Sequence, residues 1–175
     1  MNHHLIQTSP NLAWAEYVSD ISHRLNDPIQ DHLIDYLVMT IRTFEHTSTE
    51  LPIYRNIDWI QIDPYHTKSN QIKQFADTCL INSGLFPRHF LKTPNTFVHY
   101  ISFSQQGYKI LAQRQQLSIY QNIVERFISL IDILLLIRTQ SYGKPLLNPK
   151  EAEIIWRKTK SQYAKEIAHR TKNML

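Results

Sequence analysis

The chain has 175 residues, of which 42% are hydrophobic and 19% are charged. These values are typical of one globular domain and exclude an intrinsically disordered chain. Three glycines are too few for the phosphate-binding loops of nucleotide-binding folds, and one cysteine excludes both an intramolecular disulfide and a multi-cysteine zinc site. The net charge of +4 and the pI near 9.2 are mildly basic and, taken over the whole chain, identify no partner.

The first part of the chain predicts a flexible arm followed by two amphipathic helices. Residues 1–9 form the arm, and apolar residues spaced three and four apart predict helices over residues 11–25 and 28–44. Between them, the pair Asp27-Pro28 predicts a restart, in which Asp27 caps the second helix and Pro28 lies in its first turn. Both helices are expected to bury one face.

The middle of the chain predicts two further long helices. Residues 53–62 fit either a two-turn helix or a strand that has no partner elsewhere. Residues 70–83 predict a helix that ends where Gly84 takes a left-handed conformation. A helix over residues 97–113 follows. Gly107 inside it indicates a close approach of another helix or a kink, since glycine costs about 1 kcal/mol against alanine in a helix.

The most apolar stretch, residues 117–139, organises the predicted fold. Its apolar residues cover most of the circumference of a helix, so other elements must surround it on most sides. It is too short and too charged to span a membrane, which needs about 20 apolar residues. The sequence therefore predicts an all-α, single-domain bundle of five or six helices around this central helix. A thin polar line at helical spacing remains on one side: Ser118, Asn122, Glu125, Ser129 and Asp132.

The C-terminal part, residues 149–175, is predicted to be a basic helix that docks on, or extends from, a helical core domain of residues 10–148. Asn148 and Pro149 predict its cap and first turn. The helix over residues 150–173 contains seven Lys or Arg and three Glu, so its net charge equals that of the whole chain. Basic helices contact phosphate groups, and an anionic membrane surface or a solvated docking face are the alternatives. The candidate nucleic-acid or anion-binding residues follow a seven-residue spacing or lie beside it: Arg157, Lys158, Lys165 and Lys172.

Two segments carry a resemblance to a known group of proteins. Residues 75–90, FADTCLINSGLFPRHF, combine an Asp-x-Cys-Leu helix with a Gly-Leu-Phe-Pro stop. Residues 98–112 predict an aromatic-rich helix in which Gly107 precedes Tyr108. Over about residues 31–112 the chain resembles a family of uncharacterised bacterial all-helical proteins. The resemblance implies a helical fold in a bacterial cytoplasmic protein, and it implies no activity and no functional residue.

Several polar residues are candidates for chemistry. Cys79 lies on an apolar stripe, which favours a buried core residue over a nucleophile. Asp132 and Glu125 suggest a polar site. A buried Asp132 would need a hydrogen-bonding partner, but the favoured interpretation is an exposed edge of the central helix. Two aspartates and a histidine of the second helix suggest metal ligands, although a solvated surface is favoured: Asp31, His32 and Asp35. No complete motif is present, so no metal, cofactor or catalytic residue is predicted.

The lack of such motifs favours a non-catalytic interaction or adaptor protein that binds a protein partner or a second copy of itself. The first alternative is nucleic-acid binding through the basic C-terminal helix, and the second is an enzyme with an acidic site near Asp132. No secretory signal is visible, and the single cysteine suits a reducing compartment. A cytoplasmic protein is therefore expected, with a secreted effector as the alternative.

Overall fold

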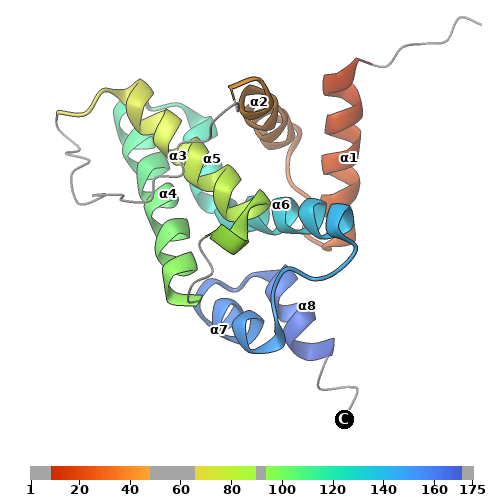
Figure 1. The fold of residues 1–175 in the computed structure, drawn as a ribbon. Coiled ribbons are helices and arrows are strands. Elements are labelled where there is room, and N and C mark those ends of the chain that lie inside the picture. Colours follow the sequence, from red (N-terminus) through yellow and green to blue (C-terminus); the bar gives the residue numbers. More distant parts are fainter. Residues whose placement is uncertain (1–8, 48–65, 90–93, 171–175) are drawn as a thin grey trace, which may run out of the picture.

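A computed structural model of the chain describes residues 9–47, 66–89 and 94–170. Within these residues every regular element is helical, so the predicted all-α single domain is confirmed (Figure 1). No helix of this part is long and apolar enough to cross a bilayer. Most of the predicted arm, and residues 53–62, lie outside the described residues. The elements are α1 (Pro10–Arg24), α2 (Asp31–Thr47), α3 (Ser69–Leu85), the short 3-10 helix η2 (Pro87–His89), α4 (Pro94–Gln115), α5 (Ser118–Glu125), α6 (Phe127–Tyr142), α7 (Pro149–Thr159) and α8 (Gln162–Arg170).

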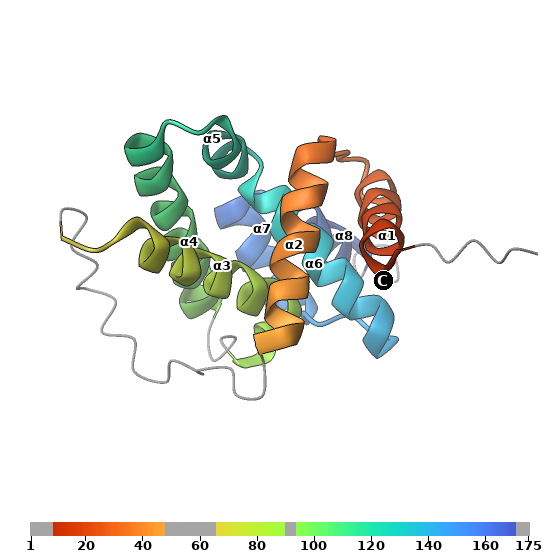
Figure 2. The same ribbon diagram turned by 90° about the horizontal axis from the view of Figure 1, so that it is seen from above.

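Helix α6 lies in the middle of the molecule and is covered from several sides. Helices α1, α3, α5 and α8 contact it, and Figure 1 shows it crossing the centre with α7 and α8 below. Seen from above, α1 and α2 lie at one end of the molecule and α4 and α5 at the other (Figure 2). The prediction of an enclosed apolar helix is confirmed by the buried α6 residues: Phe127, Leu130, Ile131, Asp132, Ile133, Leu134, Leu135 and Ile137.

The predicted central helix over residues 117–139 is in fact two helices. The chain leaves helical geometry at Arg126, between α5 and α6, with φ −105° and ψ 17°. The Arg126 guanidinium donates to the Asp27 carboxylate (Nη2 to Oδ1, 2.5 Å) and to the Pro28 carbonyl (3.0 Å). No proline or glycine marks the break, so the apolar pattern alone predicts one continuous helix.

The prediction that Asp27 caps the second helix is wrong. Helix α2 begins at Asp31, so Pro28 lies before it and not in its first turn. Both carboxylate oxygens of Asp27 instead bind the central segment. Oδ1 accepts from Arg126, and Oδ2 accepts from the Ser129 hydroxyl at 2.5 Å. Asp27 therefore ties the α1–α2 connection to the start of α6.

Two glycines allow close contacts of α3. Gly84 lies inside α3 and does not take the predicted left-handed conformation. A Cβ placed on Gly84 would lie 2.2 Å from the Leu134 Cβ, so the missing side chain lets α3 pack directly on α6. A Cβ on Gly107 of α4 would lie 3.0 Å from the Ala76 Cβ. Close approach of another helix is therefore the correct interpretation of Gly107.

The predicted C-terminal helix is also two helices. Lys160, between α7 and α8, has a left-handed conformation with φ 64°. The predicted cap at Asn148 is confirmed: its side chain accepts from the Glu151 N–H at 2.9 Å, and the Glu151 carboxylate accepts from the Asn148 N–H at 2.8 Å. Helix α7 contacts α4 and helix α8 contacts α6, so both pack on the rest of the domain.

Candidate binding pocket

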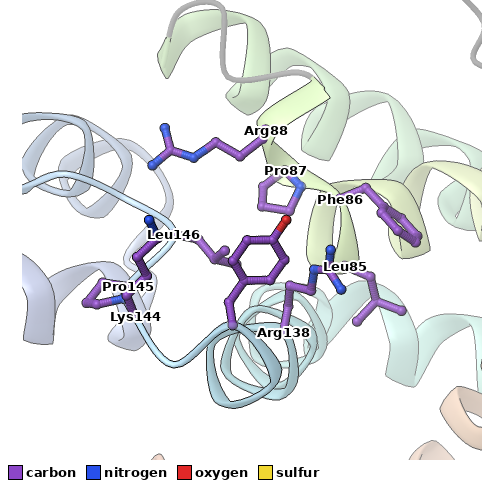
Figure 3. A pocket seen from close by; sticks show the side chains of 9 residues that line it. Leu85, Phe86, Pro87, Arg88, Arg138, Lys144, Pro145 and Leu146 are labelled. Atoms are coloured by element: carbon purple, nitrogen blue, oxygen red, sulfur yellow. The ribbon is translucent and has the colours of Figure 1, made fainter.

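A pocket of about 370 Å³ lies where the end of α3 faces the end of α6. One wall comes from α3 and η2, and the other comes from α6 and the loop that follows it (Figure 3). The described lining residues are apolar, aromatic or cationic, and none of them is acidic: Leu85, Phe86, Pro87, Arg88, Arg138, Tyr142, Lys144, Pro145 and Leu146.

Arg138 is a half-buried cation whose orientation is fixed by aromatic rings. Its guanidinium carbon lies 4.4 Å from the centre of the Tyr142 ring, one turn further along α6, and 5.5 Å from the Phe86 ring. Stacking on rings leaves the edge N–H donors of a guanidinium available. Within the described residues no carboxylate lies at ion-pair distance from Arg138. The arrangement can therefore accept an anion.

The loop after α6 is anchored at both ends. Gly143 ends α6 with φ 71°, a left-handed conformation that glycine adopts without strain. The side chains of Leu146 and Leu147 are buried in the core. The Leu146 N–H donates to the Tyr163 hydroxyl of α8 at 3.1 Å. Between these anchors Lys144 is exposed and lines the pocket.

Two further cations make the pocket positive. In Figure 3, Arg88, Arg138 and Lys144 surround it from η2, α6 and the loop. The Arg88 side chain is 59% exposed and lies 3.9 Å from the Glu151 carboxylate, a distance at which an exposed ion pair contributes little. Among the described residues, the three cations thus have one carboxylate nearby, that of Glu151, and it already accepts a hydrogen bond from the backbone at the start of α7. This excess of positive charge favours an anionic ligand.

The predicted basic face of the C-terminal helix is divided by the break at Lys160. Arg157 forms an ion pair with a glutamate one turn earlier in α7 (2.8 Å), and Lys158 donates to an asparagine of α4 (2.6 Å). Lys165 lies on α8, and Lys172 lies outside the described residues. The seven-residue spacing therefore no longer places these side chains on one helix face, and nucleic-acid binding stays a prediction.

Asp132 is buried, so the favoured interpretation of an exposed edge is wrong. Only 2% of the residue is exposed. Its Oδ1 accepts from the Ser161 hydroxyl at 2.5 Å, and its Oδ2 accepts from the Gln162 N–H at 2.7 Å. The Ser161 oxygen accepts in turn from the Ala164 N–H at 3.0 Å. The carboxylate and the serine together cap α8. Burial raises the pKa of Asp132 to about 6, although these hydrogen bonds oppose the shift.

Asp132 does not form an acidic site with Glu125. Glu125 is exposed, lies on α5 beyond the break at Arg126, and accepts from Gln121 at 2.9 Å. Asp132 lines none of the described pockets. Because its oxygens are occupied by the start of α8, we assign Asp132 a structural role.

The other predicted candidates are also occupied or exposed. Cys79 is buried, as predicted for a core residue, and burial raises the pKa of its thiol. The His32 ring lies 2.8 Å from the Asn122 amide nitrogen. Asp31 and Asp35 are exposed. Within the described residues no group of three His, Cys, Asp or Glu side chains could hold a metal ion.

An interior polar cluster around Asp77 was not predicted. Its Oδ1 accepts from the hydroxyls of Tyr36 and Tyr108, each at 2.6 Å, and its Oδ2 accepts from the Lys73 ammonium at 2.5 Å. Burial, followed by the charge of Asp77, raises the pKa of both tyrosines. The Tyr120 ring stacks on Tyr108 with 6.4 Å between centroids. The Asp77 carboxylate, the Lys73 ammonium and the hydroxyls of Tyr36 and Tyr108 are all paired with one another, so the cluster joins α2, α3 and α4 and we assign it a structural role.

The pocket was not predicted as a site either, although both its walls contain recognised helix ends. The sequence predicts that residues 84–87 stop one helix, and Gly143 and Pro145 indicate a loop over residues 141–148. The two helix ends face each other because α3 packs on α6. This packing joins residues that are far apart in the sequence, so local patterns do not predict it. The only local signal for Arg138 is its position at the end of the apolar stretch.

No family model matches the chain, and no similar protein was found among curated proteins or among solved structures. The resemblance over about residues 31–112 therefore stays a prediction from its motifs.

Proposed function

We propose that this chain is a non-catalytic interaction protein that binds an acidic segment of a partner protein in the pocket between α3 and α6. The observation that carries the proposal is the state of Arg138. The residue is half-buried, and its guanidinium lies 4.4 Å from the centre of the Tyr142 ring, with no counter-anion among the described residues. A cation that is already oriented loses little side-chain entropy when an anion binds it.

The pocket's charge supports an acidic ligand. A guanidinium presents a planar set of donors that matches a carboxylate with two parallel hydrogen bonds. Arg88 and Lys144 add positive charge at the rim, where they steer an acidic segment toward the pocket. Leu85 and Pro145 provide apolar surface for a neighbouring side chain of that segment.

The exposure of the rim supports a protein partner over a small molecule. Tyr142 is 56% exposed and the Arg88 side chain is 59% exposed. Small-molecule pockets usually enclose roughly 70–90% of their ligand. Exposed tyrosine and arginine side chains are instead typical of the residues that contribute most to protein–protein binding.

The lining also supports binding without catalysis. None of the described lining residues is a Ser, Cys, His, Asp or Glu, so the lining groups of the types used in nucleophilic or acid–base catalysis are Lys144 and Tyr142, and both are exposed. The remaining cations can bind and orient an anion.

The test is fluorescence anisotropy with a labelled peptide of alternating Glu and Phe residues, and with its Gln-for-Glu counterpart. We expect salt-sensitive binding of the Glu peptide alone. Arg138→Gln should weaken it roughly tenfold or more. Arg157→Gln removes the same charge from α7 and is the matched control, with no expected effect. No binding of the Glu peptide at high micromolar protein, or equal loss in both variants, would contradict the proposal.

The same assay with labelled single-stranded RNA and duplex DNA tests the nucleic-acid alternative. There, Arg157→Gln should weaken binding and Arg138→Gln should not. Light scattering at low and high salt then asks whether a second copy supplies the acidic segment. A dimer that Arg138→Gln dissociates identifies the partner as this chain itself, and a strict monomer assigns the acidic segment to a different protein.

A further inference from the structure

We infer that Tyr163 of α8 is a positioning residue for the pocket, so that docking of α8 on α6 sets the affinity for the acidic ligand. The inference rests on the proposed function for its ligand. The contacts that carry it are independent of that ligand.

The Tyr163 hydroxyl joins the two parts of one pocket wall. It accepts from the Leu146 N–H at 3.1 Å, and it lies 2.5 Å from the Thr139 hydroxyl. Thr139 follows Arg138 directly in α6, and Leu146 lines the pocket together with Lys144. One hydroxyl on α8 therefore holds the helical turn that carries one cation and the loop that carries another.

The position of that hydroxyl is itself fixed by α6. The start of α8 is bound to Asp132, which accepts from the Ser161 hydroxyl and from the Gln162 N–H. Asp132 lies about two helical turns before Thr139 on α6. Tyr163 is only 4% exposed. The first turn of α8 is thus attached to α6 at two points, and the second attachment is the pocket wall.

The hydrogen bond to the loop lies in a buried environment, where loss of the acceptor is costly. Without the Tyr163 hydroxyl, the Leu146 N–H would be buried and unsatisfied, or the loop would move to reach water. Movement of the loop would displace Lys144 and Leu146 relative to Arg138, and an unsatisfied N–H favours that movement. Because coupling between two binding events is reciprocal, a ligand in the pocket should also stabilise the docked α8.

The test is Tyr163→Phe, which keeps the ring and removes the hydroxyl. Tyr17→Phe is the matched control. The Tyr17 hydroxyl on α1 also bonds to α6, where it donates to Gln140 at 2.7 Å, but Tyr17 does not line the pocket. We expect the Leu146 amide to exchange with deuterium roughly tenfold faster or more in Tyr163→Phe. We also expect a several-fold weaker affinity for the Glu-Phe peptide, with neither change in Tyr17→Phe.

Two further readouts keep the outcome decisive. The Arg138 Nε–H NMR signal reports the stacking on Tyr142, and it should shift in Tyr163→Phe and not in Tyr17→Phe. The thermal unfolding midpoint of Tyr163→Phe should lie below that of Tyr17→Phe, because Tyr163→Phe removes the acceptor of a buried N–H. If Tyr163→Phe does not fold, Thr139→Val removes the second partner of the same hydroxyl and should shift that signal in the same way.

Unchanged Leu146 exchange, or faster exchange with unchanged peptide affinity, would overturn the inference. Failure of the wild-type chain to bind any peptide would instead refute the proposed ligand. In that case the Leu146 amide exchange and the Arg138 Nε–H signal still decide whether Tyr163 is a positioning residue. If both change in Tyr163→Phe, the positioning role is upheld. If either is unchanged, the role is refuted.

Discussion

The carboxylate of Asp77 on α3 and the guanidinium of Arg138, which stacks on the Phe86 ring after α3, differ in whether the protein supplies partners for their charges. Asp77 accepts hydrogen bonds from two tyrosine hydroxyls and from the Lys73 ammonium. The Arg138 guanidinium stacks on the rings of Phe86 and Tyr142 and forms no ion pair with any described carboxylate. One charge is neutralised inside the domain, and the other is oriented but left without a counter-ion among the described residues.

The difference distinguishes polar groups that hold the fold together from polar groups that can bind a ligand. A buried group whose partners are all protein groups holds helices together, and removing it strands those partners. Removing a stacked cation from a pocket wall leaves no protein carboxylate unpaired, and the charge of that cation is available to a ligand. The comparison can be tested by substitutions on both sides, because the two regions should respond very differently in stability and in binding.

The largest expected effect on stability is that of Asp77→Ala. The substitution leaves the hydroxyls of Tyr36 and Tyr108 without their acceptor, and each stranded buried hydroxyl costs about 1–3 kcal/mol. We expect the free energy of unfolding to fall by about 3–4 kcal/mol in urea titrations. Asp35→Ala, at an exposed position of α2, is the control and should change it by less than about 0.5 kcal/mol. A loss below about 1 kcal/mol for Asp77→Ala would show that water replaces the carboxylate.

Asp132 gives the next largest effect, and it depends on pH. Its folded pKa of about 6 lies above the ordinary value of 3.8, so the folded state binds more protons between these values. The contribution of this group to stability is therefore fully present below pH about 4 and is lost as the pH rises to about 6. At 1.36 kcal/mol per unit the loss is about 3 kcal/mol.

Asp132→Asn removes the titration and keeps an oxygen that can accept from the Gln162 N–H. Urea unfolding between pH 4 and 7 should therefore show a smaller loss of stability with rising pH in the variant than in the wild type. Asp35→Asn is the control and should keep the wild-type slope. Identical slopes for the wild type and Asp132→Asn would contradict the raised pKa.

The sequence predicts most of the helices because their signals are local. Apolar spacing and the cap at Asn148 depend on residues within one or two turns of each other. The breaks at Arg126 and Lys160 have no proline or glycine, and their causes are distant in sequence. Arg126 binds the α1–α2 connection, and the start of α8 binds Asp132 on α6. Such long-range hydrogen bonds override a continuous apolar pattern.

The candidate site was harder to predict for the same reason. The basic residues that the sequence places on one face, such as Lys158 and Lys165, are separated by the break between α7 and α8. The cations of the pocket, Arg88, Arg138 and Lys144, come from three separate elements and have no shared spacing. The packing of α3 on α6 brings them together. The role of Gly84 in that packing was not predicted, because its sequence context indicates a left-handed helix stop.

Gly84 therefore offers a test of smaller expected size. A Cβ at this position would lie 2.2 Å from the Leu134 Cβ, so α3 and α6 must separate. Overpacking costs about 1–3 kcal/mol, partly offset by the better helix propensity of alanine. We expect Gly84→Ala to lower the free energy of unfolding by about 1–2 kcal/mol. Affinity for the Glu-Phe peptide should fall too, since Leu85 and Phe86 line the pocket.

Gly107→Ala is the matched control. Its Cβ would lie 3.0 Å from the Ala76 Cβ, which requires a shift of only a few tenths of an ångström. The gain in helix propensity should nearly compensate this contact, so we expect little net change in stability and no change in peptide affinity. Equal effects of the two substitutions would show that the α3–α6 contact does not shape the pocket.

Arg138→Gln should have a smaller effect on stability than Arg126→Gln, and this difference tests whether Arg138 has an internal partner. Arg126 and Arg138 both flank the apolar segment, but Arg126 donates to the Asp27 carboxylate and to the Pro28 carbonyl. Arg126→Gln should therefore cost about 1 kcal/mol, since these partly exposed groups can find water. Arg138→Gln loses ring stacking, about 0.5 kcal/mol at this partly exposed site, and should still abolish most of the peptide binding. If urea titrations ranked the two in the reverse order, Arg138 would have an internal partner, and its charge would not be available to a ligand.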